Sequence, residues 1–157
     1  MAIHEAMTVG ARYLEDLQPG DRFVSGTFVV AEEDIIAFAR AFDPQPYHLD
    51  REAARRSAFS SLAASGWHTA AIMMRLWVET RPFGDHPILG LGVDELRWLL
   101  PVRPGDTLHL TGEVVDVAPS RSKPDRGTVR VRLAVVNQKG ATVMTLVPMM
   151  IVSRRPV

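Results

Sequence analysis

Residues 67–80 read Trp-His-Thr-Ala-Ala-Ile-Met-Met-Arg-Leu-Trp-Val-Glu-Thr, and this stretch decides the fold. Its apolar residues recur at intervals of three and four, which predicts an α-helix. Ile72, Met73 and Leu76 make that helix apolar nearly all round, and only Arg75 and Glu79, one turn apart, mark a polar edge. We therefore expect other elements to enclose the helix, and strands are what remain.

Four long strands are predicted after this helix, over residues 88–102, 107–117, 128–136 and 141–152. Val129, Val131, Leu133 and Val135 alternate with more polar residues, which gives one buried face and one wetter face. The alternation of the strand before it slips phase, which suggests a bulge near Gly112. An antiparallel sheet wrapped around a central apolar helix, the α+β hotdog fold, satisfies these constraints. A competing all-β barrel would leave the helix unexplained.

The first half of the chain is predicted to hold a strand over residues 23–30 and a helix over residues 32–42. Pro44 and Pro46 stop that helix and should stiffen residues 43–47 into a loop, after which a short helix follows over residues 51–57. Pro-Gly-Asp occurs at residues 19–21 and again at residues 104–106, each time as the turn before a strand.

Composition excludes several classes of protein. With 157 residues we expect one domain, residues 1–157, and with 18 basic against 18 acidic residues we expect no nucleic-acid partner. The chain has no Cys, so it has no disulfide, no thiolate nucleophile and no Cys-ligated zinc or iron–sulfur cluster. No window holds 18 apolar residues, and the first ten residues do not resemble a signal peptide. We therefore expect a soluble, cytoplasmic protein without a membrane partner.

Asp43 and His48 form the first candidate site, a carboxylate and an imidazole five positions apart in the proline-rich segment. Such a pair can activate one water, because histidine takes and returns a proton near neutral pH while the carboxylate orients the water or the ring. The alternative is structural, since Asp before Pro starts turns and a His near a helix cap is often only packed.

Ser65 and Gly66 form the second candidate, at the start of the buried helix. Gly66 lets a ligand approach the backbone, and the free N–H groups of the first turn favour a developing oxyanion. The alternative is that Ser65 is a helix N-cap and Gly66 a packing contact. A two-His, one-carboxylate iron site beginning at His48-Leu49-Asp50 would belong to an all-β barrel, which the helix argues against.

These motifs resemble the MaoC-like dehydratases, which include the (R)-specific enoyl-CoA hydratases. The family's hydratase motif places Asp, Pro, His and an acid where this chain has Asp43, Pro46, His48 and Asp50, and residues 63–67 and 98–107 also match. Where the family has Gly, Asn, His and Met, this chain has Phe42, Gln45, Ser65 and Trp67.

The resemblance implies a homodimer or higher homo-oligomer with the hotdog fold, a lyase that adds water to a 2-enoyl-CoA and removes it from a 3-hydroxyacyl-CoA. Asp43 and His48 would hold the water and Gly66 would bind the thioester carbonyl. Gln45, Ser65 and Trp67 would contact the substrate, and coenzyme A phosphates could meet Arg51, Arg55, Arg56, Arg121, Lys123 or Arg126. No metal or other cofactor is needed, since coenzyme A belongs to the substrate. A hotdog thioesterase and a non-catalytic acyl-CoA-binding module remain as alternatives.

Overall fold

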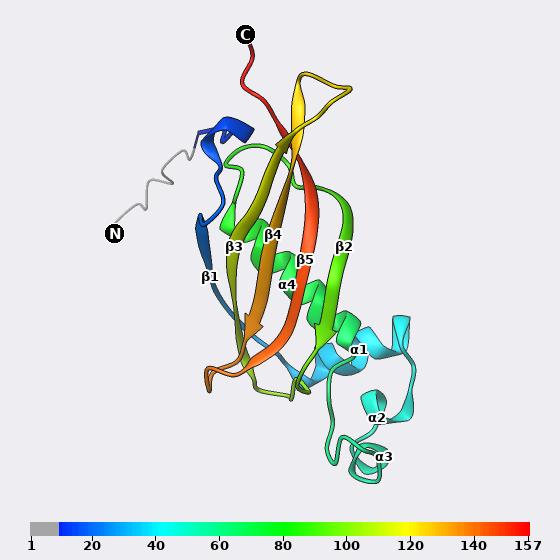
Figure 1. The fold of residues 1–157 in the computed structure, drawn as a ribbon. Helices are drawn as coiled ribbons and strands as arrows, with labels where there is room; N and C mark the ends of the chain where they lie inside the picture. The colour runs from blue at the N-terminus through cyan, green and yellow to red at the C-terminus, as the bar shows by residue number, and fades with distance from the viewer. Residues whose placement is uncertain (1–9) are drawn as a thin grey trace, which may run out of the picture.

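The computed structural model describes residues 10–157 as one antiparallel sheet crossed by a long helix (Figure 1). The strand order is β1-β3-β4-β5-β2. The strands are β1 (Arg22–Val29), β2 (Leu89–Trp98), β3 (Thr107–Pro119), β4 (Arg126–Val136) and β5 (Thr142–Ser153). The helices are α1 (Glu32–Phe42), α2 (Pro46–Leu49), α3 (Arg51–Arg55) and α4 (Gly66–Thr80), with a 3₁₀ turn, η1 (Leu14–Asp16), before β1. This arrangement is the predicted α+β hotdog fold.

The core lies between α4 and the concave face of the sheet. The helix buries Ile72, Met73, Leu76 and Trp77, and every second residue of β4 from Val129 to Val135 is fully buried, as the alternation predicted. Trp77 packs edge-on against a phenylalanine of β1, with ring centroids 5.2 Å apart, and its indole N–H points at the sulfur of Met150. These contacts fix the helix across the sheet.

The expectation that α4 is enclosed on all sides is wrong for the single chain. Met74 and Val78 are 42% and 50% exposed, because one sheet covers only one side of a helix. Beside them runs β2, an edge strand of the sheet, with Leu89, Leu91 and Val93 each about half exposed. Met74 and Val93 line one apolar hollow between α4 and β2, and these five exposed residues of the two elements are named here the β2 surface.

The strand predicted over residues 88–102 stops at Trp98. Both Leu99 and Leu100 direct their backbone N–H groups to the carbonyl of Val143, so the chain bends out of the sheet there. The bulge predicted near Gly112 lies instead at Val115, where the β3–β4 register shifts. The two corrections have one cause, because a residue pattern shows which side chains are apolar but does not show where a strand leaves its partner.

The proline-rich segment differs in part from its prediction. Helix α1 ends at Phe42 as expected, but Pro46 begins a one-turn helix, α2, where only a loop was predicted up to residue 47. Proline is favoured in the first turn of a helix, because it has no N–H to satisfy and its φ is already helical. The short helix that follows ends at Arg55, two residues earlier than predicted.

The two Pro-Gly-Asp turns are built alike. Gly20 and Gly105 have φ of +95° and +86°, and the aspartate after each glycine accepts a hydrogen bond from a backbone N–H three residues earlier. A left-handed φ at this position favours glycine. The turn before β3 also joins β1, since the N–H of Gly105 donates to the carbonyl of Val30.

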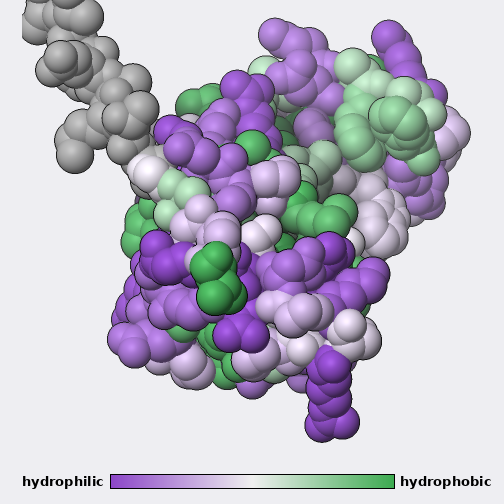
Figure 2. Space-filling view, turned by 90° about the horizontal axis from the view of Figure 1, so that it is seen from above, coloured by the Kyte–Doolittle hydropathy of each residue, from purple (hydrophilic) through white to green (hydrophobic). Residues whose placement is uncertain are grey.

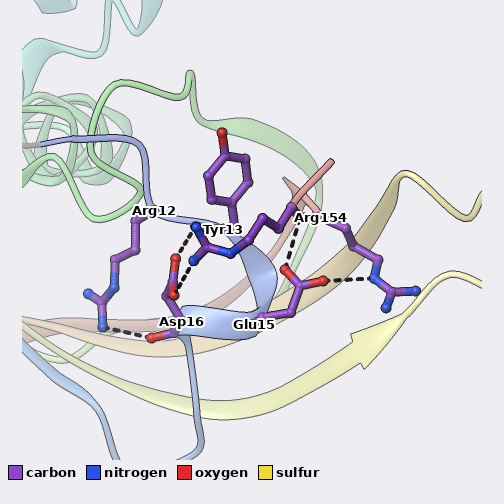
Figure 3. Close-up of polar contacts among 6 residues, drawn as sticks. Arg12, Tyr13, Glu15, Asp16 and Arg154 are labelled. Carbon is purple, nitrogen blue, oxygen red and sulfur yellow. Dashed lines mark hydrogen bonds and ion pairs between the residues drawn. The ribbon is translucent and has the colours of Figure 1, made fainter. Parts of the chain in front are cut away.

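The end of the sheet that carries the β3–β4 turn is fastened by ion pairs. Glu15 accepts hydrogen bonds from the Arg154 side chain at 3.0 Å and from the backbone N–H of Arg155, and Asp16 accepts one from the Arg155 side chain at 2.7 Å (Figure 3). These contacts hold η1 against the C-terminal tail. Seen from above this end, the surface is mainly hydrophilic (Figure 2).

Candidate active site

Asp43 stands where α1 ends, and its carboxylate is held by neighbours on both sides. Its backbone N–H closes the helix by donating to the carbonyl of Ala39, and Pro44 prevents another turn. The amide Nε2 of Gln45 donates to Oδ1 of Asp43 at 2.6 Å. Burial opposes ionisation, but hydrogen bonds from Gln45 and the Ser65 hydroxyl, and the charge of His48 when its ring is protonated, hold the pKa of Asp43 below its ordinary value. The group is therefore a carboxylate at neutral pH.

His48 lies in α2 and is 4% exposed. Its Nδ1 lies 2.7 Å from the carbonyl oxygen of Ala63, and because a carbonyl only accepts, Nδ1 carries the hydrogen. In the neutral ring Nε2 then has a free lone pair, and it lies 3.4 Å from Oδ2 of Asp43. Two acceptors at this separation do not bond to each other, so they are suited to share the hydrogens of one water.

Ser65 and Gly66 open helix α4. The Ser65 hydroxyl accepts a hydrogen bond from the N–H of Trp67 at 3.3 Å, which makes Ser65 the N-cap. Among residues 10–157 the N–H of Gly66 has no hydrogen-bond acceptor. It is a free donor at the positive end of a 15-residue helix, where a developing oxyanion is stabilised.

Gly66 also has a packing role. A Cβ at this position would lie 2.5 Å from the Trp98 indole, and the indole N–H donates to the carbonyl of Gly66 at 2.9 Å. Ser65 is thus a helix N-cap and Gly66 is a packing contact, as the structural alternatives proposed. These roles do not exclude the proposed contact between Gly66 and an oxyanion. The first turn of α4 therefore contains the capping hydroxyl of Ser65, a glycine packed against Trp98 and the free N–H of that glycine.

A cavity of about 400 Å³ brings these groups together. Its polar wall holds Asp43, His48, Ser65 and Gly66, and its apolar wall is made by the following residues: Tyr47, Phe59, Trp67, Trp98, Leu99, Leu100, Pro101 and Val102. A pocket with few converging polar groups in an apolar lining suits a small acyl group. Gln45 does not line this cavity and reaches it only through Asp43.

Trp67 belongs to the cavity wall and not to the core, since it is 60% exposed. Its ring meets that of Trp98 edge-on, with centroids 5.1 Å apart. The sequence reasoning missed Trp98, Tyr47 and Phe59 as site residues. The sequence held one indication for Trp98, because residues 98–107, which it begins, match the MaoC-like pattern. Nothing in the sequence, however, places its indole over Gly66.

The remaining titratable residues lie outside the cavity. Asp50 accepts a hydrogen bond from the N–H of Ala53 and so caps α3. His68 is buried and stacks flat on Phe38, with ring centroids 4.8 Å apart, and burial lowers its pKa. Over residues 10–157 no three His, Asp or Glu side chains are grouped so as to hold a metal ion, and no helix is long and apolar enough to cross a bilayer.

Comparison with known proteins places the chain in a family. A family model described as the MaoC like domain matches residues 17–137. The chain belongs to the MaoC-like dehydratase family. The crystal structure of a MaoC-like dehydratase from Rhodospirillum rubrum is 49% identical and superposes with a TM-score of 0.84, over 92% of this chain and 99% of that one.

Two further relatives extend the comparison. An uncharacterized protein, YdeM of Bacillus subtilis, is 36% identical over 126 residues, which are 80% of this chain and 88% of that protein. R-hydratase PhaJ1 of Pseudomonas aeruginosa is 25% identical with a TM-score of 0.72, over 92% of this chain and 88% of that one. Two other curated relatives are longer, and the matched segments span 29% and 20% of their lengths. MaoC-like and hydratase relatives together support hydration or dehydration as the general activity.

Proposed function

We propose that this protein adds water reversibly to the double bond of a 2-enoyl-CoA, giving a 3-hydroxyacyl-CoA. The observation that carries the proposal is that two unbonded acceptors, Oδ2 of Asp43 and Nε2 of His48, face one cavity together with the free N–H of Gly66. Hydration of a conjugated thioester needs these two functions, a base for water and a donor for the carbonyl oxygen.

In the hydration direction, Asp43 and His48 hold the attacking water between them. As its oxygen bonds to C3, the water passes one proton to the pair, with Nε2 of His48 as the base. The electrons of the C2–C3 double bond move toward the thioester carbonyl, where the N–H of Gly66 stabilises the enolate. The enolate then takes the proton at C2 and the pair returns to its starting state. Water is the only species added, and the steps call for no metal or redox cofactor.

Product analysis separates this proposal from its alternatives. The protein is incubated with a panel of 2-enoyl-CoA and 3-hydroxyacyl-CoA thioesters while the absorbance of the conjugated thioester and the amount of free thiol are followed. Loss of conjugation from the 2-enoyl thioesters and gain of conjugation from the 3-hydroxyacyl thioesters, both without free thiol, are the expected results. Release of coenzyme A would show a thioesterase, and binding without either change would show a non-catalytic module.

We propose further that two copies join through the β2 surface. Edge strands with exposed apolar residues are covered in stable proteins, and pairing β2 with its copy would continue the sheet and bury Met74 and Val78. Val93→Lys on β2 should give monomers by light scattering at micromolar concentration. Val24→Lys is the matched control, because Val24 is an exposed valine on the opposite edge strand, β1. A wild-type monomer, or dissociation by both variants alike, would refute this interface.

Five of the six candidate phosphate contacts divide into two groups in the structure, and the sixth, Arg56, pairs with Glu52. Arg51 and Arg55 border a hollow of about 330 Å³ with Arg103, and residues that line this hollow are next in the chain to residues of the cavity wall. Arg121 and Lys123 lie in the β3–β4 turn and Arg126 begins β4, at the opposite end of the sheet from α2 and α3 (Figure 1). The first group is therefore our candidate for the coenzyme A phosphates. Arg55→Gln should raise KM for a CoA thioester and leave KM for the matching pantetheine thioester unchanged.

A further inference from the structure

Tyr47 is connected to the carboxylate of Asp43 by a chain of two hydrogen bonds. The Tyr47 hydroxyl donates to Oε1 of Gln45, and Nε2 of the same amide donates to Oδ1 of Asp43 at 2.6 Å. Both bonds join residues two positions apart, and together they connect Asp43 at the end of α1 with Tyr47 in the first turn of α2. Nothing in the mechanism proposed above uses Tyr47.

The amide of Gln45 must point one way to serve Asp43. An amide has a donor end and an acceptor end, and a carboxylate only accepts, so the reversed amide would set Oε1 against Asp43 and repel it. Gln45 is exposed, so packing does not fix its side chain. It also has one more rotatable bond than the asparagine that is usual at this position in the MaoC-like family. An exposed side chain of this length loses rotamer freedom when it is held, and a second contact is needed to keep it in place.

The Tyr47 hydroxyl supplies that second contact, because its donation occupies Oε1 and leaves Nε2 toward Asp43. The ring of Tyr47 is itself fixed. It meets His48 edge-on at 4.6 Å between centroids and lies against Phe59 at 5.1 Å. The hydroxyl is thus held by the same short helix that carries His48, so the two members of the water-binding pair are positioned from one element.

We propose that Tyr47 is a positioning residue, which acts through Gln45 to hold the Asp43 carboxylate in place for the attacking water. The role in hydration rests on the proposed function, whereas the effect on Asp43 does not. Besides Tyr47, the groups that act on the Asp43 carboxylate are Gln45, Ser65 and His48.

The test compares Tyr47→Phe with Tyr13→Phe. The chain has two tyrosines, and Tyr13 lies beside Arg155 and His86, away from the cavity, so its variant loses a hydroxyl without touching the site. Tyr47→Phe keeps the ring and its packing, and its melting temperature should stay near that of the wild type. We expect kcat to fall about three- to tenfold, the value of one hydrogen bond, with KM unchanged. Tyr13→Phe should change neither.

A double-mutant cycle and a titration exclude a merely structural role. In a Gln45→Ala background, Tyr47→Phe should lower kcat less than twofold further, since the connection to Asp43 is already absent. NMR titration of the side-chain carboxyl should show an upward shift of the Asp43 pKa in Tyr47→Phe and none in Tyr13→Phe, because a bond that favours the ionised form has weakened.

The outcomes separate the two proposals. If the wild type hydrates no thioester but Tyr47→Phe still raises the Asp43 pKa, the proposed function fails and the positioning role stands. If hydration is found and Tyr47→Phe changes neither kcat nor the Asp43 pKa, the positioning role is refuted. If Tyr47→Phe lowers kcat equally with and without Gln45, the positioning role is also refuted, because the effect of Tyr47 on kcat would then not act through the Gln45 amide.

Discussion

Replacement of Trp67 by methionine tests whether this residue limits the size of the acyl group. Trp67 is 60% exposed in the chain, and its main ordered contact is the edge of Trp98. Losing one aromatic edge contact costs about 1 kcal/mol, which lowers Tm by about 2–4 °C in a protein of this size. Replacing a tryptophan of the core would cost on the order of 2–5 kcal/mol, with a fall in Tm of roughly 4–20 °C.

The effect on acyl selectivity follows from the same geometry. Trp67 and Trp98 form part of the apolar cavity wall, and a thioether in place of the indole leaves room for additional methylenes. Two methylenes transferred into an apolar pocket are worth about 1.6 kcal/mol, or about fifteenfold in kcat/KM. Trp67→Met should therefore raise the ratio of kcat/KM for 2-hexenoyl-CoA over 2-butenoyl-CoA, which differ by two methylenes, about fifteenfold.

The assay measures kcat/KM for both thioesters by absorbance, beside Tm from thermal unfolding, for the wild type and the variant. Trp98→Met is not a suitable control, because Trp98 also bonds Gly66. Val24→Ala is suitable, since it removes an exposed apolar side chain that lies outside both the cavity and the β2 surface. An unchanged ratio together with a fall in Tm of more than about 8 °C would refute the reasoning and assign Trp67 to the core.

Three more predictions follow from the site and the fold. Asp43→Asn and His48→Ala should each lower kcat by about two to four orders of magnitude with the circular dichroism spectrum unchanged, and near-normal turnover in either variant would remove that residue from the mechanism. Gly66→Ala sets a Cβ 2.5 Å from Trp98, so the indole must move. We expect the free energy of unfolding, measured with urea, to fall by about 1–3 kcal/mol and kcat to fall because the oxyanion contact weakens. A fully active and stable variant would show that the turn adjusts freely. Glu15 has a pKa lowered by the Arg154 hydrogen bond, so its contribution to stability is present above the unfolded-state pKa, near 4.5, and is lost as pH falls through the folded-state value. Glu15→Gln should therefore be less stable than the wild type at pH 7 and equal to it in strong acid, and a constant difference at both pH values would contradict the ion-pair origin.

The sequence by itself determined the long elements and the candidate groups, but not the one-turn helix α2. Helix α4 follows from the spacing of residues 67–80, and the strands follow from alternation, because one buried face of a helix or strand imposes a period on its own residues. Asp43, His48 and Gly66 were found from residue type, proline stiffening and a family resemblance, all of which are local in the chain.

Only the tertiary structure decided how these groups work together. The carbonyl of Ala63, fifteen residues from His48, selects the tautomer of that ring, and Trp98, thirty-two residues from Gly66, explains why no Cβ fits there. The open side of α4 and the exposed edge of β2 also depend on how far one sheet can curve around a helix. Such contacts join residues that are distant in the chain, and a local pattern holds no information about which of them meet, because packing and hydrogen-bond geometry are settled only when the whole chain has folded.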